Sequence, residues 1–175
     1  MGPIFTLGRD TLKDADEYQA EVLKGIQTRG YGRNKFSLSH PNRYKIGYLG
    51  EWAAHRHFTE SGLQVTWSPS ADLNSDRGDL QIGPYAIDVK MRSEWWHDVF
   101  MYLEEQWQAR KTRCDFYIGG AVDADFSRVQ LRCVISARVL ESLASTSKYG
   151  NLGRCKPFEE CGSIADAVEY FSSTV

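Results

Sequence analysis

The sequence predicts an α/β (α+β) domain in which a central mixed β-sheet is flanked by helices. The chain has 175 residues, of which 42% are hydrophobic and 25% charged, as is typical of a globular domain that is large enough to bury a core. Apolar residues recur at helical spacing near both ends of the chain. Between these ends lie short apolar runs separated by turn residues, which indicate the strands of a sheet.

The helices are predicted from this periodicity. In residues 10–28 the apolar positions recur every three or four residues, and acidic side chains gather in the N-terminal half, where they stabilise a helix dipole. We expect this segment to form the first helix. Further helices are expected over residues 47–61, 98–111, 137–145 and 163–172.

The strands are predicted from short apolar runs and from the turns between them. They are expected over residues 63–67, 78–82, 85–91, 115–123 and 128–136. Gly83 and Pro84 form a strong turn pair between the second and the third of these strands. The order of elements predicts one domain over residues 1–175, with a helix and a loop in residues 1–46 and a packing extension from about residue 148.

Basic residues are concentrated in one predicted loop, residues 29–45, which is rich in glycine, asparagine and serine. The whole chain has a formal net charge of −2, but no acidic residue lies between Val22 and Gly50. Basic side chains can hold phosphates, and the aromatic side chains between them can stack on bases. We therefore expect nucleic-acid contacts here; the alternative is a solvated loop whose aromatic side chains pack into the core. The residues expected to contact nucleic acid are Arg29, Arg33, Lys35, Arg43 and Lys45.

The stretch RGDLQIGPYAIDVKMR, residues 77–92, places three charged side chains on a predicted hairpin. Asp88 and Lys90 lie two residues apart on one strand, so they point to the same face. The turn brings Asp79, at the start of the preceding strand, near Asp88. Two neighbouring carboxylates repel each other unless a cation lies between them, and their oxygens are ligands that Mg²⁺ and Mn²⁺ prefer. The pattern favours a metal-dependent site; the alternative is a surface hairpin that carries charges for solubility alone.

Glu51 is a fourth candidate, near the start of the second predicted helix. Alone, a glutamate in that position would be interpreted as stabilising the helix dipole. Followed by the GD of residues 78–79 and the DVK of residues 88–90, it resembles the pattern of the PD-(D/E)xK nuclease superfamily. The resemblance covers roughly residues 45–123. Gly78 stands where the family usually has proline.

The resemblance implies a restriction-endonuclease-like core and cleavage of DNA or RNA that depends on Mg²⁺ (or Mn²⁺). Asp79 and Asp88 would bind the metal, and Glu51 would support the metal site. The backbone carbonyl of Val89 would complete the coordination. Lys90 would position or activate the water that attacks the phosphate. These four side chains would be the catalytic residues.

Further residues near the motif are candidates for contact with the substrate. Some members of the superfamily carry a glutamine on the helix after the motif; Gln106 corresponds to it, and Gln108 is the weaker choice. His55 lies four positions after the helical glutamate, on the same face. Trp95 and Trp96 follow the motif strand, where they would stack on or wedge between bases. The alternative for these tryptophans is a cluster that anchors the next helix.

The four cysteines and the chain's hydropathy bear on its location in the cell. Cys114, Cys133, Cys155 and Cys161 are widely spaced without a CxxC pair, so we expect free thiols. The alternative is a metal or iron–sulfur site that uses the last two of them. No apolar run approaches the roughly 18 residues of a membrane span, and the N-terminus lacks the features of a signal peptide. We expect an intracellular (cytoplasmic) protein with no membrane partner.

Three hypotheses of function follow. The first is a divalent-metal-dependent nuclease that hydrolyses phosphodiester bonds of DNA, as an endonuclease or an exonuclease. The second is a catalytically inactive nucleic-acid-binding module of the same fold. The third is an interaction protein that holds its partner with the aromatic surface around Trp95 and Trp96. A homodimer would be expected if both strands of a duplex are cut at once.

Overall fold

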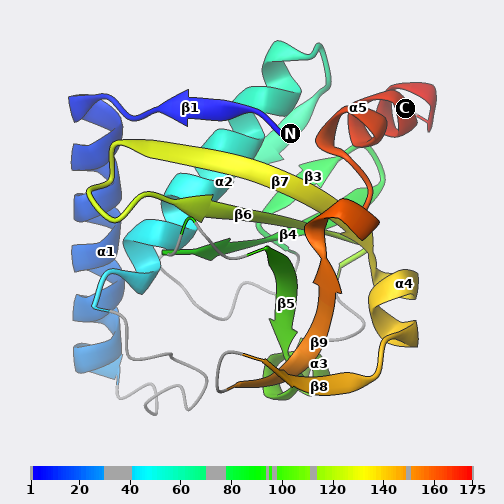
Figure 1. The fold of residues 1–175 in the computed structure, drawn as a ribbon. Coiled ribbons are helices and arrows are strands. Elements are labelled where there is room, and N and C mark those ends of the chain that lie inside the picture. The colour runs from blue at the N-terminus through cyan, green and yellow to red at the C-terminus, as the bar shows by residue number, and fades with distance from the viewer. Residues whose placement is uncertain are drawn as a thin grey trace.

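The structure is a computed structural model that describes residues 2–29, 41–69, 78–93, 95, 98–110, 114–148 and 151–174. The described residues form a six-stranded sheet and a three-stranded sheet with flanking helices (Figure 1). The spatial order of the large sheet is β1 (Ile4–Thr6), β7 (Arg128–Ser136), β6 (Phe116–Val122), β4 (Tyr85–Arg92), β3 (Leu80–Ile82) and β2 (Val65–Trp67). The order of the small sheet is β5 (Val99–Leu103), β9 (Asn151–Pro157) and β8 (Ser145–Lys148). The helices are α1 (Arg9–Arg29), α2 (Arg43–Glu60), α3 (Glu104–Arg110), α4 (Ala137–Ser142) and α5 (Ile164–Thr174), and η1 (Phe158–Glu160) is a 3₁₀ turn.

The large sheet is mixed, and helices flank it, which confirms the predicted fold class. β4 and β6 run parallel, with Asp88 opposite Tyr117, and the other neighbouring strands run antiparallel. A parallel pair needs a long crossover between its strands. Here the crossover contains β5 and α3, so the chain adds a strand of the small sheet before it returns to the large one. β4 therefore lies inside the large sheet, between β3 and β6.

α2 covers one face of the large sheet, and α1 packs against α2 (Figure 1). The predicted helices over residues 10–28 and 47–61 correspond to α1 and α2, but α2 begins earlier, at Arg43. The side-chain oxygen of Gln19 on α1 accepts the backbone N–H of Lys45 at 3.2 Å. This bond satisfies one of the N–H groups that the first turn of a helix leaves without an intrahelical partner. Residues 43–45, expected in a loop, are therefore helical.

The opposite face of the large sheet is covered by the small sheet, α3 and α4, and the core there is aromatic. Tyr102 of β5 and Tyr117 of β6 have ring centroids 5.0 Å apart, and Trp107 of α3 packs against both rings. Cys133 of β7 and Leu140 of α4 complete this second core. Because the two cores share β6 and β7, the large sheet is the central layer of the described structure.

The helix predicted over residues 98–111 is wrong in its first half. Val99–Leu103 forms β5, and the helix begins only at Glu104. The residues Val99, Phe100, Met101 and Tyr102 are all buried, so this strand has no alternation of apolar and polar positions to distinguish it from a helix. Its partner β9 lies about fifty residues further along the chain, and pairing with that strand decides its conformation.

Besides β5, the strands β1, β8 and β9 were not predicted from the sequence. β1 pairs with β7 at the edge of the large sheet, and β8 pairs with β9. The helix expected over residues 137–145 ends at Ser142 as α4, because β8 begins at Ser145. The C-terminal extension does pack on the same domain: Ile164, Ala167 and Phe171 of α5 are buried in the core on the α2 side. Within the described ranges, no helix is both long and apolar enough to cross a membrane.

Candidate active site

The four predicted catalytic residues lie around the edge of β4 that extends beyond β3. β3 pairs with β4 only at residues 85–87, whereas β6 pairs with β4 over residues 87–92. The edge of β4 beyond Ile87 is therefore not covered by β3. Asp79 precedes β3, Asp88 and Lys90 lie on β4, and Glu51 comes from α2, which packs on β4.

Two glycines allow the backbone to approach β4 closely here. Gly78 has φ +82°, and a Cβ atom on it would lie 2.9 Å from the carbonyl oxygen of Ile87. Proline, with φ near −65°, cannot adopt this conformation, which explains why the chain has glycine before Asp79. Gly50 lies against Met91 of β4, where a Cβ would fall 2.0 Å from the Met91 Cγ. This close approach brings the next residue of α2, Glu51, to the edge of β4.

Asp79 is held at this edge by the backbone of β4. Its N–H donates to the carbonyl of Ile87 at 2.8 Å, and its Oδ2 accepts the N–H of Val89 at 2.6 Å. The N–H and C=O of one residue in a strand point to the same edge, so the Val89 carbonyl also points toward the edge where Asp79 lies. Burial of the Asp79 carboxyl, followed by the charges of Asp88 and Glu51, raises its pKa well above the usual range, and a hydrogen bond to Asp88 adds to the increase.

Asp88 is the most buried of the charged groups, with an exposed fraction of 3%. Its Oδ1 pairs with the Lys90 Nζ at 2.5 Å, and its Oδ2 accepts the Tyr102 hydroxyl at 3.1 Å. The Lys90 ammonium also lies 5.2 Å from the centre of the Tyr102 ring. The Lys90 side chain keeps 25% of its surface exposed, so the site reaches solvent through Lys90.

Glu51 reaches the site from α2 and is held by an indole. The Trp67 Nε1 of β2 donates to the Glu51 Oε2 at 3.1 Å. Burial raises the pKa of Glu51 to about 7. The Trp67 hydrogen bond and the Lys90 charge lower this pKa, and the Asp88 charge raises it. His55 packs on the Trp67 ring at 5.2 Å between centroids, so it supports the residue that holds Glu51.

Comparison with known proteins adds no family assignment. No protein-family model matches the chain, and no curated protein matches it.

The structure describes only part of the predicted basic surface. Arg33, Lys35 and the side chain of Arg29 lie outside the described residues. Arg43 packs over the ring of its neighbour Tyr44, 4.6 Å from the centroid. The side chain of Lys45 is only 12% exposed and pairs with Asp16 at 2.7 Å. Lys45 therefore joins α2 to α1.

The other predicted contact residues occupy different places. Gln106 is partly exposed on α3, and the amide of Gln108 donates to the Glu104 carboxylate at 2.6 Å. Trp95 lies between two guanidinium groups of β7, 5.1 Å from that of Arg128 and 5.2 Å from that of Arg132. Trp96 lies outside the described residues.

The four cysteines are free thiols. Cys133 and Cys161 share a side-chain hydrogen bond. The Cys155 thiol donates to the Gly153 carbonyl at 3.6 Å, and the Cys161 thiol to the Pro157 carbonyl at 3.3 Å. Each of the two thiols named as alternative metal ligands thus donates a hydrogen bond to a backbone carbonyl in the described structure.

Sequence reasoning missed one residue at the site, Tyr102, and a row of polar residues on β7. Tyr102 was placed in a helix, and only the pairing of β5 brings its hydroxyl to Asp88. The polar row on β7 is predicted only as part of a strand, with no role for Arg128, Gln130 and Arg132. A signal was present in the sequence RVQLR, where polar residues alternate with Val129 and Leu131, which are buried on the α2 side.

Proposed function

We propose that the protein is a divalent-metal-dependent nuclease that hydrolyses phosphodiester bonds of DNA. The observation that carries the proposal is the pair of neighbouring carboxyl groups, Asp79 and Asp88, beside the Lys90 ammonium at the edge of β4 beyond the end of β3. A scaffold gains no stability from two buried carboxyl groups that disfavour each other's ionisation. A site for a divalent cation and a phosphate does require them.

The oxygen atoms at this edge fit Mg²⁺ or Mn²⁺. Asp79 and Asp88 supply carboxylates, and the Val89 carbonyl opens toward the same edge. Among the described residues, no three acidic, histidine or cysteine side chains converge in one metal-binding cluster. Mg²⁺ commonly uses one or two carboxylates and takes its other ligands from water and substrate phosphate, so two carboxylates are sufficient. The cation, when bound, would lower the pKa of water and draw charge from the scissile phosphate.

The side chains of this chain would supply the remaining chemistry. Lys90 would hold the attacking water or balance the charge that grows on the phosphate. Glu51, whose pKa is about 7, can accept a proton near neutral pH, as a general base must. Tyr102 fixes the orientation of Asp88 through its hydroxyl. In the reaction the water oxygen bonds to phosphorus, one P–O bond breaks, and the departing oxygen takes a proton.

The arrangement of elements supports a restriction-endonuclease-like core. The helix that carries Glu51 packs on the strand that carries Asp88 and Lys90, and this strand lies inside a mixed sheet. The helix α3 and the parallel strand β6 follow in the expected order. A single catalytic edge per chain would cut one strand at a time, so simultaneous cleavage of a duplex would need two copies of the chain.

The alternative is a nucleic-acid-binding module without catalysis. The basic and aromatic residues Arg128, Arg132 and Trp95 favour binding on their own, whether or not the carboxylates are active. Chelation separates the two functions, because hydrolysis at this site requires the cation and binding by arginine and tryptophan does not.

The proposal is tested by cleavage of labelled single-stranded, linear duplex, supercoiled and branched DNA, with an RNA strand for comparison. Each reaction is run with Mg²⁺, with Mn²⁺ and with chelator. The variants are Asp88→Asn and Lys90→Met, which preserve the approximate shape of each side chain. Asp166→Asn is the matched control, because Asp166 is an exposed aspartate at the start of α5.

We expect metal-dependent cutting by the wild type and by Asp166→Asn, and a loss of at least about a hundredfold in the other two variants. If Asp88→Asn still cuts DNA, the cleavage comes from a contaminant or from another site. Binding without cutting under every metal condition would contradict the nuclease and leave the binding module.

A further inference from the structure

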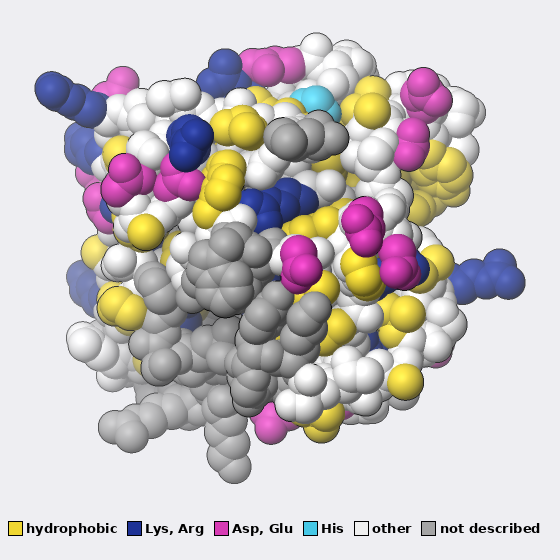
Figure 2. Space-filling model, in the orientation of Figure 1, with side chains coloured by type: hydrophobic (Ala, Val, Ile, Leu, Met, Phe, Trp, Pro, Cys, Tyr) yellow, Lys and Arg dark blue, Asp and Glu magenta, His cyan; other side chains and the backbone are white. Residues whose placement is uncertain are grey.

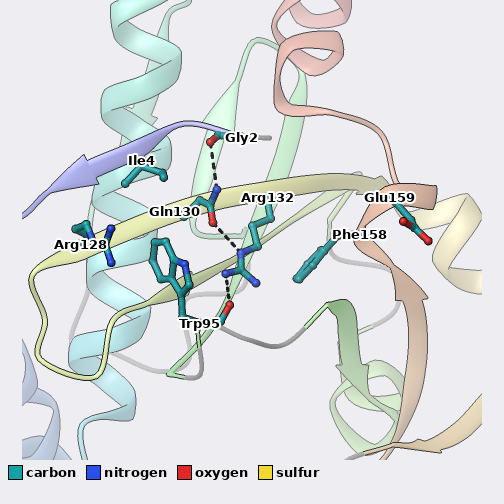
Figure 3. A pocket seen from close by; sticks show the side chains of 8 residues that line it. All are labelled: Gly2, Ile4, Trp95, Arg128, Gln130, Arg132, Phe158 and Glu159. Atoms are coloured by element: carbon teal, nitrogen blue, oxygen red, sulfur yellow. Dashed lines mark hydrogen bonds between the residues drawn. The ribbon is translucent and has the colours of Figure 1, made fainter.

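A second site lies on the same face of the large sheet as Asp88 and Lys90. It is a pocket of about 460 Å³ whose lining includes Trp95, Arg132 and Phe158 (Figure 3). The pocket lies over β7, between Trp95 and Phe158 of the turn η1 (Figure 3). In Figure 2 basic side chains appear in the middle of this face, bordered by hydrophobic and acidic ones.

Strand register places the pocket beside the candidate active site. Lys90 and Arg92 lie two residues apart on β4, so their side chains share a face. Arg92 is opposite Ala121 of β6, and Ala121 is opposite Gln130 of β7, so Gln130 lies in the same row and on the same face. Neighbouring strands are about 4.8 Å apart, which puts this row of β7 about 10 Å from β4. Because Arg92 lies four residues beyond Asp88 on β4, this row of β7 is roughly 16 Å from Asp88, a distance that a few nucleotides of a bound strand can span.

The pocket is preformed, because its side chains hold each other in position. Gln130, which is buried, accepts the Arg132 Nε at 3.0 Å and donates to the carbonyl of Gly2 at 3.4 Å. Arg132 also donates to the backbone carbonyl of Trp95. Its guanidinium lies 5.4 Å from the centre of the Phe158 ring. Two aromatic rings and the fixed guanidinium between them therefore form one rigid surface.

Arg128 provides a second cation at the open side of the pocket. Its side chain is 52% exposed and pairs with Asp123 at 2.7 Å. This pair uses only the Arg128 Nε, and a guanidinium has further N–H donors that can meet another anion. The acidic residue among the described lining residues, Glu159, lies at the rim with its carboxylate directed away from Trp95 (Figure 3). The inner part of the pocket is thus aromatic and cationic.

We propose that this pocket binds one unpaired nucleotide of the strand that is cut. A flat base would stack on the aromatic surface of Trp95 and Phe158, and its phosphate would meet Arg128 or Arg132. A volume of about 460 Å³ accommodates a ligand the size of a nucleotide. A base inside a duplex is stacked on its neighbours and must leave the stack before it can lie on these rings, so the pocket favours an unpaired nucleotide. The inference rests on the proposed nuclease function and specifies its substrate: DNA with an unpaired nucleotide near the cleavage point.

Binding in the presence of chelator tests the pocket separately from catalysis. The probes are a labelled single strand, a blunt duplex, a duplex with a short overhang and an RNA strand, with 2-aminopurine in place of one base in turn. Anisotropy gives the affinity, and 2-aminopurine fluorescence reports stacking of that base. The variants are Trp95→Ala and Arg128→Ala. The control is Arg56→Ala, because Arg56 is 49% exposed, pairs with Glu60 at 2.7 Å and packs over a tryptophan ring on the α2 side.

The wild type should bind the single strand and the overhang more tightly than the blunt duplex, with 2-aminopurine quenched at one position. Trp95→Ala should lose the quenching and bind about tenfold or more weakly. Arg128→Ala should also weaken binding and should reduce its dependence on salt. Arg56→Ala should match the wild type. If Trp95→Ala is poorly folded by circular dichroism, Arg128→Ala decides the test, because its side chain is exposed.

The outcomes separate this inference from the nuclease itself. Pocket variants that bind like Arg56→Ala would overturn the inference, even if the wild type cuts DNA with Mg²⁺. Loss of quenching in a protein that never cuts would support the pocket and contradict the nuclease. A wild type that binds no nucleic acid would overturn both. Preferential binding of RNA would overturn the assignment of DNA as the bound strand.

Discussion

The two faces of the large sheet use the same strands but carry different chemistry. On the α2 side, the described residues bury a hydrophobic core that includes Ile118 of β6 and Leu131 of β7. On the other side, the buried aromatic rings share the space with Asp88, Lys90 and Gln130. Since alternate residues of one strand belong to opposite faces, β4 contributes Val89 to the first side and Asp88 to the second.

The difference shows which face stabilises the fold and which face is available for function. Burial of apolar side chains is favourable, whereas burial of carboxyl groups costs free energy unless they are paired. The second face also contains the Tyr117 hydroxyl, which is buried and has no hydrogen-bond partner among the described residues. We infer that the α2 side contributes more of the fold's stability than the functional side, where the second hydrophobic core also contains buried polar groups.

The largest expected effect is on the α2 side. Leu131→Ala removes a fully buried side chain and should lower the free energy of unfolding by roughly 2–5 kcal/mol. Metal-dependent cleavage measured well below the melting temperature should remain, because Leu131 faces away from Asp88. Chemical denaturation and the cleavage assay measure the two effects. A selective loss of cleavage in a folded variant would contradict the division between the faces.

The second effect is a pH dependence of stability on the functional side. The pKa of Glu51 is about 7 in the folded protein and 4.5 in a free glutamate, so the folded state retains a proton that the unfolded chain has lost between these values. The free energy of unfolding should therefore fall as pH rises from 4.5 to 7, by roughly 1–3 kcal/mol. The raised pKa of Asp79 acts in the same direction.

Denaturation at pH 5 and pH 8, with chelator and with Mg²⁺, measures this dependence. Glu51→Gln should reduce the dependence of the free energy of unfolding on pH, because the titrating group is removed. Mg²⁺ should restore stability at pH 8, because a bound cation favours the ionised carboxylates. A wild-type protein without metal that becomes more stable toward pH 8 would contradict the assignment of Glu51 and Asp79.

A smaller effect distinguishes two tyrosines whose rings are in contact. Tyr102→Phe removes the hydroxyl that donates to Asp88 and should lower the free energy of unfolding by about 1–2 kcal/mol. Tyr117→Phe removes a buried hydroxyl without a partner in the described structure and should be neutral or stabilising. Thermal denaturation of the two variants gives the comparison. Equal destabilisation by both changes would mean that the hydroxyl bond to Asp88 contributes little.

The smallest effect is expected at the predicted basic surface. Lys45→Ala breaks an ion pair with Asp16, removes the packing of Lys45 over the Phe126 ring and should lower the free energy of unfolding by roughly 1 kcal/mol. Because the Lys45 ammonium is paired with Asp16 of α1, this variant should bind single-stranded DNA like the wild type, whereas Arg128→Ala should bind more weakly. Anisotropy with both variants measures this difference. A greater loss of affinity with Lys45→Ala would move the binding surface from β7 to the start of α2.

Elements with a local pattern can be predicted from the amino-acid sequence. α1, α2, α5 and the strands β3, β4, β6 and β7 follow from periodicity and turn residues close in the chain. The neighbourhood of Asp79, Asp88 and Lys90 followed from one hairpin, because two-residue alternation and a tight turn fix which side chains meet.

Contacts between segments that are distant in the chain depend on the three-dimensional packing. β5 is buried on both faces, so it has no periodicity of its own, and β9 makes it a strand. That pairing places the Tyr102 hydroxyl on Asp88. In the same way, Trp95 acquires its surroundings from Arg128 and Arg132, which come from a strand more than thirty residues later. Such contacts depend on the packing of sheet on sheet, and a local sequence pattern contains no information about which distant face will cover it.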